Sequence, residues 1–140
     1  MECRFVPGLY TGNSDLDSQH KKIFSKANDL LKAIKAELEL DTLKKISDFF
    51  ADYTIHHSSD EELYMYREGY PKLHEHKKSH EKLKEQVLAI RDKLVENTSV
   101  EDLSFVVIEF VVDYLIEHIK TEDMEYIDFL RIRSQMDNML

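Results

Sequence analysis

Four long segments of the chain carry an apolar residue at every third or fourth position. That spacing places the apolar side chains on one face of an α-helix, which turns by about 100° per residue. The three glycines and two prolines lie at or beyond the ends of these segments. Four helical stripes have to be buried against one another, so the pattern predicts an all-α protein.

The apolar stripes predict four helices with short connections. Their expected ranges are 17–39, 42–68, 71–96 and 100–122. Asp15 or Asp17 suits the N-cap of the first helix, because a short carboxylate can accept a hydrogen bond from the free N–H groups there. Gly69 suits the C-terminal end of the second helix, and Pro71 suits the first turn of the third.

A chain of 140 residues builds one hydrophobic core, so residues 1–140 are expected to form a single domain. Helices of roughly 20 to 25 residues joined by short loops pack antiparallel to their sequence neighbours. We therefore predict an up-down-up-down four-helix bundle with an N-terminal arm. Residues 123–140 are predicted to add a short helical extension, whose apolar side chains are Tyr126, Ile127, Phe129 and Leu130.

Charge and composition argue against several classes of function. A formal net charge of −9 disfavours nucleic acid and anionic membrane surfaces, because both attract Lys and Arg. No segment approaches the roughly 20 apolar residues that cross a bilayer, and the N-terminus lacks the basic start and apolar run of a signal peptide. The single cysteine, Cys3, cannot form an internal disulfide. These features favour a cytoplasmic protein.

Polar residues occupy core positions on all four predicted helices. A buried imidazole or carboxylate is costly unless it is hydrogen-bonded or bound to a metal, so these residues need a shared explanation. Residues four apart in sequence differ by only about 40° around a helix. His57 and Glu61 therefore project into the same region of the bundle, and so do His76 and His80. The polar residues at core positions are His20, His57, Glu61, His76, His80 and His118.

A metal site accounts for all of these residues. Imidazoles and carboxylates without a thiolate suit iron, zinc, copper or nickel. With Asp123 added, seven ligands are too many for one tetrahedral zinc ion, so two metals bridged by carboxylates are the simplest arrangement. Asp123 follows His118 by five residues, about 140° around an ideal α-helix. It can therefore share the site only from a displaced turn or at the edge.

Short motifs carry these polar residues, and in combination the motifs are highly specific. They read Gln19-His20-Lys21, His57-Ser-Ser-Asp-Glu61-Glu62 with Met65, Tyr70-Pro71, His76-Lys-Lys-Ser-His80 and His118-Ile-Lys-Thr-Glu-Asp123. Over about residues 10–130 the chain resembles the hemerythrin family, in its bacterial single-domain form.

The resemblance implies two non-haem iron ions joined by a bridging oxo or hydroxo group. One coordination position stays open, on the iron that has fewer histidines. The resemblance implies that dioxygen binds there reversibly, for oxygen carriage, storage or delivery, and that the protein is not an enzyme. It assigns three histidines to one iron, two to the other and two carboxylates to both: His76, His80 and His118; His20 and His57; Glu61 and Asp123.

The same resemblance implies a dry, apolar wall around the dioxygen pocket. Two of its expected members depart from the family pattern, because Ser58 stands where phenylalanine is usual and Tyr114 where tryptophan is usual. Both changes make the pocket wetter, so we expect faster autoxidation than in a relative with phenylalanine at the first position. The expected pocket residues are Ile23, Ser58, Tyr114, Leu115 and Ile119.

Other functions are compatible with the same site. The chain could bind oxygen or nitric oxide as a sensor that acts through a separate protein partner. It could be a di-iron enzyme that reduces oxygen or peroxide, although oxygen-activating bundles of that kind carry Glu and ExxH ligands. It could also handle iron, in which case iron would turn over instead of staying bound.

Several polar residues near the motifs have simpler interpretations. His56 and His74 are expected on the surface or on helix flanks. Glu62 and Glu122 adjoin the site carboxylates but are expected on a solvated helix face. Tyr126 is expected either to pack in the core or to form a hydrogen bond within the bundle.

Overall fold

The computed structural model describes residues 2–96 and 99–139, and these residues contain helices but no strand. The α-helices are α1 (Ser14–Lys35), α2 (Leu40–Arg67), α3 (Leu73–Val95), α4 (Val100–Glu109) and α5 (Met124–Met139). Two π-helical segments, η2 (Phe110–Ile116) and η3 (Ile119–Asp123), connect α4 to α5. A short 3-10 helix, η1 (Pro7–Leu9), precedes α1.

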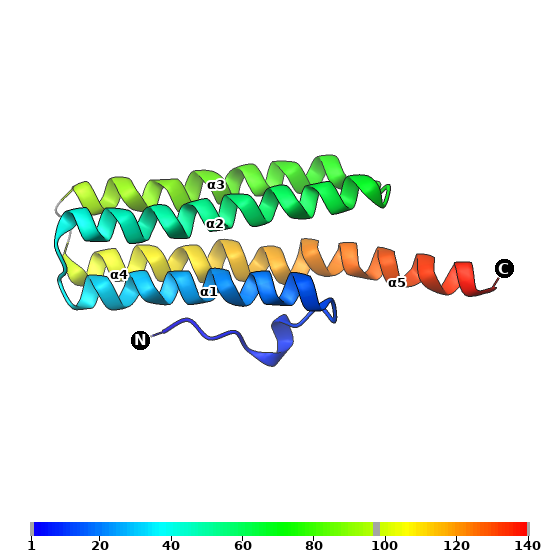
Figure 1. The fold of residues 1–140 in the computed structure, drawn as a ribbon, viewed down its shortest axis with the longest axis horizontal. Helices are drawn as coiled ribbons and strands as arrows, with labels where there is room; N and C mark the ends of the chain where they lie inside the picture. Colours follow the sequence, from blue (N-terminus) through cyan, green and yellow to red (C-terminus); the bar gives the residue numbers. More distant parts are fainter. Residues whose placement is uncertain (1, 97–98, 140) are drawn as a thin grey trace.

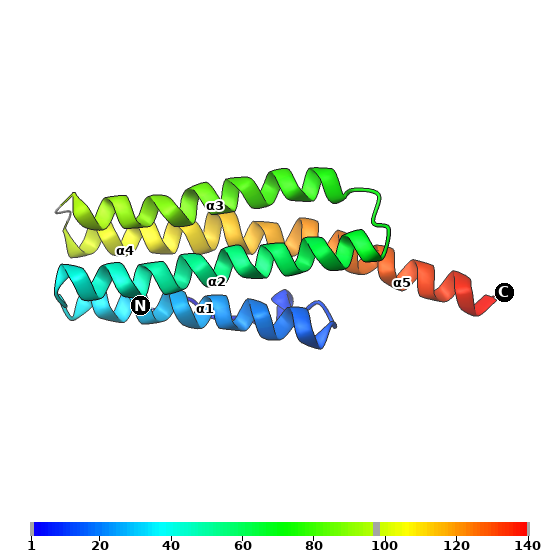
Figure 2. The same cartoon turned by 45° about the horizontal axis from the view of Figure 1, so that its top comes forward.

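The helices form an up-down-up-down bundle, which confirms the predicted fold class (Figures 1 and 2). α2 packs against α1 on one side and against α3 on the other, and α4 packs against both α1 and α3. α4, η2, η3 and α5 follow one another as a continuous rod. The last part of this rod, α5, projects beyond the end of the bundle as the expected helical extension (Figure 1).

Two apolar clusters occupy the interior. The larger one fills the half of the bundle near the α1–α2 and α3–α4 connections and includes Leu30, Phe50 and Ile90. Burying each such side chain stabilises the folded state by about 1.5–3 kcal/mol relative to leaving it exposed. The smaller cluster joins Met65 of α2 to Tyr70 and Tyr126 near the other end. Between the two clusters lies a buried polar zone.

The N-cap of α1 is Asn13, not Asp15 or Asp17. The Asn13 side chain accepts a hydrogen bond of 3.0 Å from the N–H of Leu16. Asp17 is buried and accepts bonds from the backbone N–H and the hydroxyl of Thr11, each 2.8 Å long. Its carboxylate therefore ties the N-terminal arm to the helix, and α1 begins three residues earlier than expected.

The C-terminal end of α1 and both ends of α2 and α3 differ from expectation by one to four residues, whereas α4 begins at Val100 as expected. α1 stops at Lys35 because Glu37 adopts a left-handed backbone conformation, with φ at 52°. Gly69 does follow α2 as expected, with φ at 66°, and the N–H of Tyr70 bonds back to the carbonyl of Met65. Pro71 lies in the turn before α3 and not in its first helical turn, since α3 begins at Leu73.

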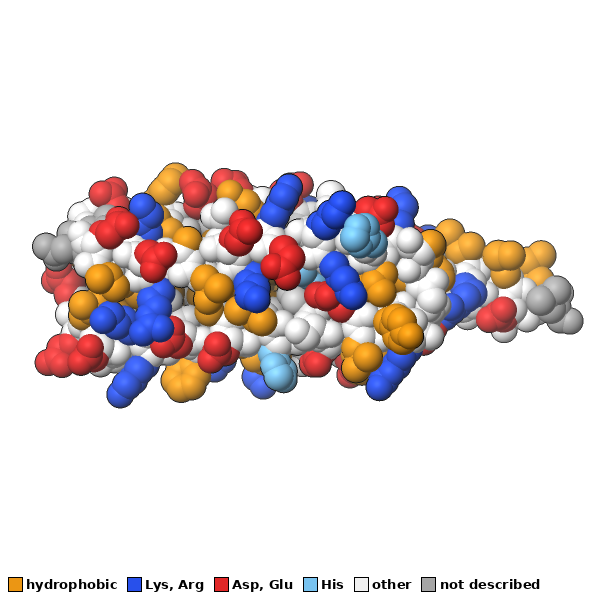
Figure 3. Space-filling view, turned by 90° about the horizontal axis from the view of Figure 1, so that it is seen from above, with side chains coloured by type: hydrophobic (Ala, Val, Ile, Leu, Met, Phe, Trp, Pro, Cys, Tyr) orange, Lys and Arg blue, Asp and Glu red, His pale blue; other side chains and the backbone are white. Residues whose placement is uncertain are grey.

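The surface of the bundle is charged and mixed. Figure 3 shows acidic and basic side chains interspersed over one face, with hydrophobic side chains gathered on the projecting end. In α5 the exposed apolar residues are Ile132, Met136 and Met139. Among the described residues, no helix combines the length and the apolar character that crossing a membrane requires.

Candidate metal centre

Seven polar side chains from α1, α2, α3 and the α4–α5 rod meet in the buried polar zone of the bundle. Each of these residues is at most 5% exposed. They comprise every histidine and carboxylate expected at the site: His20 from α1, His57 and Glu61 from α2, His76 and His80 from α3, and His118 and Asp123 from the stretch around η3. The structure thus brings together all seven residues that the motifs single out.

The two carboxylates divide the five imidazoles into two groups. On one side, the Oδ1 atom of Asp123 lies 3.0 Å from the Nε2 atoms of His76 and His118. The Oε1 atom of Glu61 approaches Nε2 of His76 at 2.5 Å and Nε2 of His80 at 3.2 Å. The first group therefore contains three imidazoles and one oxygen from each carboxylate.

The second group uses the other oxygen of each carboxylate. Oδ2 of Asp123 lies 3.0 Å from Nε2 of His20, and Oε2 of Glu61 lies 3.3 Å from Nε2 of His57. Within each group, one ligand atom from every residue lies within 4.8 Å of the others. Glu61 and Asp123 therefore belong to both groups, as bridging ligands between two metal ions would.

The π-helical segment η3 explains how Asp123 reaches the site. A π-helical turn is closed by hydrogen bonds between residues five apart, so such residues lie nearly above one another on the helix. Here the N–H of Met124 bonds to the carbonyl of Ile119, five residues earlier. The extra residue in this turn brings Asp123 onto the face of His118. The segment 100–122 is therefore not one regular α-helix. Of the two ways in which Asp123 could share the site, the displaced turn is the one observed.

Most of the polar atoms at the centre lack a hydrogen-bond partner. These atoms are buried, so leaving them unpaired costs on the order of 1–3 kcal/mol each. Metal ions would satisfy all of them at once, since neutral imidazole nitrogens and carboxylate oxygens are metal ligands. The unpaired atoms that belong to the two groups are His20 Nε2, His80 Nε2, His118 Nε2, Glu61 Oε2 and both carboxylate oxygens of Asp123; Nδ1 of His20 is also buried without a partner.

The outer ring nitrogens of three histidines are held by neighbouring polar side chains. Nδ1 of His57 contacts Oε1 of Gln19 at 2.5 Å, and Nδ1 of His80 contacts Oε2 of Glu62 at 2.8 Å. These contacts direct the Nε2 atoms inward. Bonds of this kind fix the tautomer and the orientation of a ligating imidazole and raise its basicity.

Nδ1 of His118 is held by two residues at once. It lies 2.6 Å from Oε2 of Glu122 and 2.9 Å from the hydroxyl of Ser79, which itself donates to Glu122. Glu62 and Glu122 therefore do not belong to a merely solvated helix face, and that expectation is wrong. The four-residue spacing of His118 and Glu122 was a signal for this contact, whereas nothing in the sequence pointed to Ser79.

The electrostatics of the cluster favour positive charge. Burial disfavours a charged imidazole, but Asp123 and Glu61 outweigh it and raise the pKa of His76 to about 9. The pKa of His118 is also raised well above its usual value, since Asp123, Glu122 and Glu61 oppose the effect of burial. In Asp123 burial and Glu61 raise the pKa, yet His118 and His20 lower it overall. Burial raises the pKa of Glu61 as well, but hydrogen bonds with the surrounding imidazoles lower it well below its usual value, so both carboxylates are anionic and require cations beside them.

The expected pocket residues do not share one environment. Ile23, Leu115 and Ile119 are almost completely buried in the larger apolar cluster, and Tyr114 packs at its edge. Ser58 instead lines a surface pocket between α2 and α3 together with Glu62 and His80. Its hydroxyl donates to the carbonyl of Thr54. Ser58 therefore borders the group with three imidazoles.

The remaining candidates lie where simple packing places them. His56 and His74 are exposed, as expected. Tyr126 packs in the smaller apolar cluster, where its ring centre lies 5.1 Å from that of Tyr70.

A helical bundle with this buried cluster of imidazoles and bridging carboxylates defines a metal-binding protein. The comparison with known families agrees: the family described as Hemerythrin HHE cation binding domain matches residues 11–130. The chain belongs to the hemerythrin family.

Individual relatives support the same assignment. The chain is 32% identical over 120 residues to a bacteriohemerythrin of Clostridium acetobutylicum, covering 84% of this chain and 92% of the relative. It is 30% identical over 111 residues to the myohemerythrin of Sipunculus nudus, covering 79% of each chain. A hemerythrin-like protein of Naegleria gruberi is 29% identical over 116 residues, with 82% of each chain covered.

Proposed function

We propose that the centre holds two non-haem iron ions with a bridging oxo or hydroxo group. Iron is one of the metals that imidazole and carboxylate ligands suit, and family membership favours it over zinc, copper or nickel. The proposed ligands of one iron are His76, His80 and His118, those of the other are His20 and His57, and Glu61 and Asp123 bridge both.

We further propose that the protein binds dioxygen reversibly, for carriage, storage or delivery. The observation that carries this proposal is the unequal division of the imidazoles, with three on one side of the carboxylates and two on the other. If both ions are octahedral, the bridging groups and five imidazoles fill all positions but one. An open coordination position distinguishes a reactive metal site from a structural one.

The chain's own residues supply the surroundings that reversible binding needs. Ile23, Leu115 and Ile119 exclude water from the apolar side of the centre, because their side chains are at most 2% exposed. On the two-histidine side, Gln19 holds the ring of His57 through its Nδ1 atom, and Oδ2 of Asp123 lies 3.0 Å from Nε2 of His20. When bound, the irons would supply the electrons that dioxygen binding requires.

The testing experiment is metal analysis followed by an optical titration. We expect two irons per chain, and an absorption band that appears when the anaerobically reduced protein meets dioxygen and disappears when dioxygen is removed. Absence of bound iron would contradict the proposed site. Immediate oxidation without a reversible band would contradict oxygen carriage and favour a sensor of oxygen or nitric oxide, or an enzyme that reduces oxygen or peroxide.

A further inference from the structure

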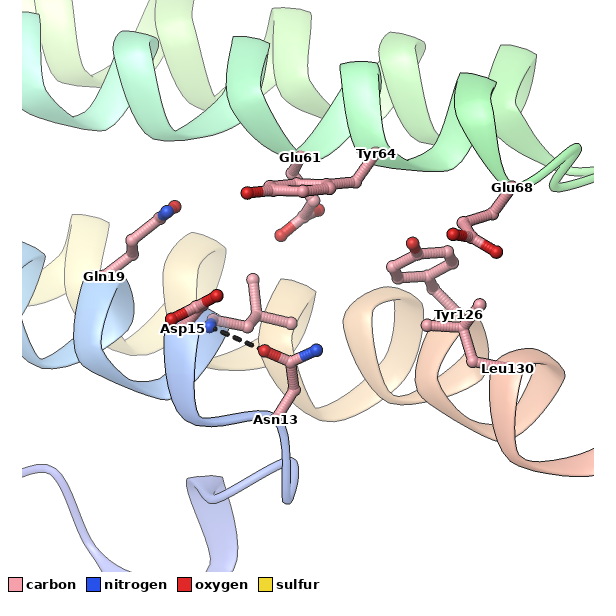
Figure 4. Close-up of a pocket in the computed structure, with 9 residues that line it drawn as sticks. Asn13, Asp15, Gln19, Glu61, Tyr64, Glu68, Tyr126 and Leu130 are labelled. Atoms are coloured by element: carbon pink, nitrogen blue, oxygen red, sulfur yellow. Dashed lines mark hydrogen bonds between the residues drawn. The ribbon is translucent and has the colours of Figure 1, made fainter. Parts of the chain in front are cut away.

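A second feature of the site is a cavity of about 140 Å³ that reaches the centre from the side opposite the apolar wall. It lies where the first turns of α1, the last turns of α2 and the start of α5 come together (Figure 4). Its lining includes Asp15 and Gln19 from α1, Glu61 and Tyr64 from α2, and Tyr126 and Leu130 from α5.

The lining of this cavity carries oxygen-bearing and acidic side chains, and among the described residues neither a lysine nor an arginine lines it. Glu68 also lines it but forms an ion pair with Arg133 of α5. Asp15, which is exposed, and Glu61, which is buried, remain as the negative charges at its outer and inner ends. A cleft lined by charge of one sign concentrates ions of the opposite sign.

Glu61 connects the cavity to the metal centre. Its side chain points into the space between α2 and the opposite helices in Figure 4. Glu61 is 2% exposed, and its Oε2 atom is buried without a hydrogen-bond partner. This is the oxygen that lies 3.3 Å from His57, in the group with two imidazoles. The cavity therefore ends at Glu61, a residue whose carboxylate has one unpaired oxygen on the two-histidine side.

We propose that this cavity is the path by which a divalent cation enters the buried centre, ferrous iron under the proposed function. Asp15 attracts the ion at the mouth, the hydroxyls of Tyr64 and Tyr126 offer oxygen contacts along the way, and the carboxylate of Glu61 receives it. The inference rests on the proposed metal site but is separate from dioxygen binding.

The alternative routes are less favourable for an ion. On the apolar side, a hydrated cation would have to pass Ile23, Leu115 and Ile119, and placing an unpaired charge among apolar side chains is very costly. Dioxygen is neutral and gains little from acidic side chains, so a carboxylate-lined path suits cations better. Two competitors remain: entry through global unfolding of the bundle, and entry through the pocket of about 120 Å³ beside His80, which the cationic side chain of Lys84 also lines.

The first test blocks the cavity in the metal-loaded protein. Release of ferrous iron from the reduced protein to an excess of an external chelator is followed by the colour of the chelate. Leu130→Trp fills the cavity from α5, whereas the control Ile132→Trp adds the same bulk on the same helix at a residue that is 52% exposed. We expect release to slow by roughly tenfold in Leu130→Trp only.

The second test removes the charge at the mouth. Asp15→Asn is compared with Asp92→Asn, an equal loss of charge at an exposed position of α3. We expect cobalt(II) uptake by the metal-free protein to slow by roughly threefold or more in Asp15→Asn only, and the difference to shrink in high salt because salt screens exposed charges. The amount of cobalt bound at equilibrium should not change.

The outcomes separate this inference from the proposed function. Equal rates in the cavity variants and their controls would overturn the entry path while leaving the metal site intact. Release rates that match the global unfolding rate in every variant would overturn it as well, and urea dependence measures that rate. A wild-type chain that binds no metal would overturn the proposed function itself.

Discussion

Nε2 of His118 lies 3.0 Å from Oδ1 of Asp123, although the two residues are five positions apart on one helical rod. The π-helical hydrogen bond from Met124 to Ile119 makes this approach possible. The neighbouring residue Glu122 then faces the opposite ring nitrogen of His118 at 2.6 Å. One irregular turn thus positions a bridging carboxylate and the residue that orients the imidazole.

We expect the outer carboxylates to strengthen metal binding. Replacing Glu122 with Gln, or Glu62 with Gln, should lower metal affinity by about 10–100-fold, because the imidazoles of His118 and His80 lose an anionic hydrogen-bond partner. Competition with a chelator of known affinity measures the change. Glu117→Gln, at an exposed position of the same rod as Glu122, is the matched control. Affinities equal to that of the control would rule out this role.

Removing the metal should destabilise the bundle. A ligand that binds only the folded state stabilises it by about 4 kcal/mol when its free concentration is about 1,000 times Kd. For a chain of this size that stabilisation raises Tm by on the order of 10 °C. Thermal unfolding of the loaded and metal-free protein, followed by circular dichroism, measures the difference. Identical melting temperatures would contradict a metal site in the core.

The metal-free protein should lose stability as pH rises from about 6.5 to 9. The pKa of His76 is about 9 in the folded chain, against 6.5 for an unperturbed histidine. A histidine whose pKa is raised by folding stabilises the folded state fully below its unfolded pKa and loses that contribution as pH passes the folded one. Chemical denaturation across this range measures the trend. Constant stability from pH 6 to pH 9 would contradict the charged cluster.

The loaded protein should show the opposite trend. Metal ligation requires neutral imidazoles, so protons compete with the metal for His76 and His118. We expect affinity to rise as pH rises through the same window, and acid to release the metal. A pH series of chelator competitions checks this. Affinity that falls with rising pH would be incompatible with histidine ligation.

The predicted effect of Ser58 concerns water beside the centre. In Ser58→Phe we expect slower autoxidation, because the larger ring fills the pocket of about 120 Å³ next to His80 and excludes water. The decay of the oxygenated spectrum in air measures the rate. Ser18→Phe, at an exposed position of α1 outside this pocket, is the control. An equal or faster decay in Ser58→Phe would remove this explanation.

The bundle could be predicted from the sequence because its apolar stripes are long and regular. The same stripes exposed the site, since a histidine such as His20 or His57 at a core position conflicts with the pattern around it. The fold and the presence of the site could both be predicted because they depend only on the spacing of residues along the chain.

What the sequence could not supply depends on local competition and on three-dimensional placement. Asn13, Asp15 and Asp17 are all good N-cap residues, and only the contact of Asp17 with the N-terminal arm decides among them. The π-helical turn before Asp123 contains neither glycine nor proline, so no residue in it marks the irregularity. The contact between Ser79 and His118 exists because α3 packs beside the α4–α5 rod, and no local pattern in the sequence indicates that contact.

The placement of the two ends of the site has a topological consequence. His20 and Asp123 are about 100 residues apart in the chain, and a cross-link that closes so long a loop removes a large share of the unfolded chain's freedom. Their side chains lie 3.0 Å apart. A metal held by both would join these distant segments as a disulfide does, but only in the folded state, because the site does not exist in the unfolded chain. The single cysteine of this chain cannot form an internal disulfide, so metal coordination would provide the connection between distant segments that a disulfide provides in other proteins.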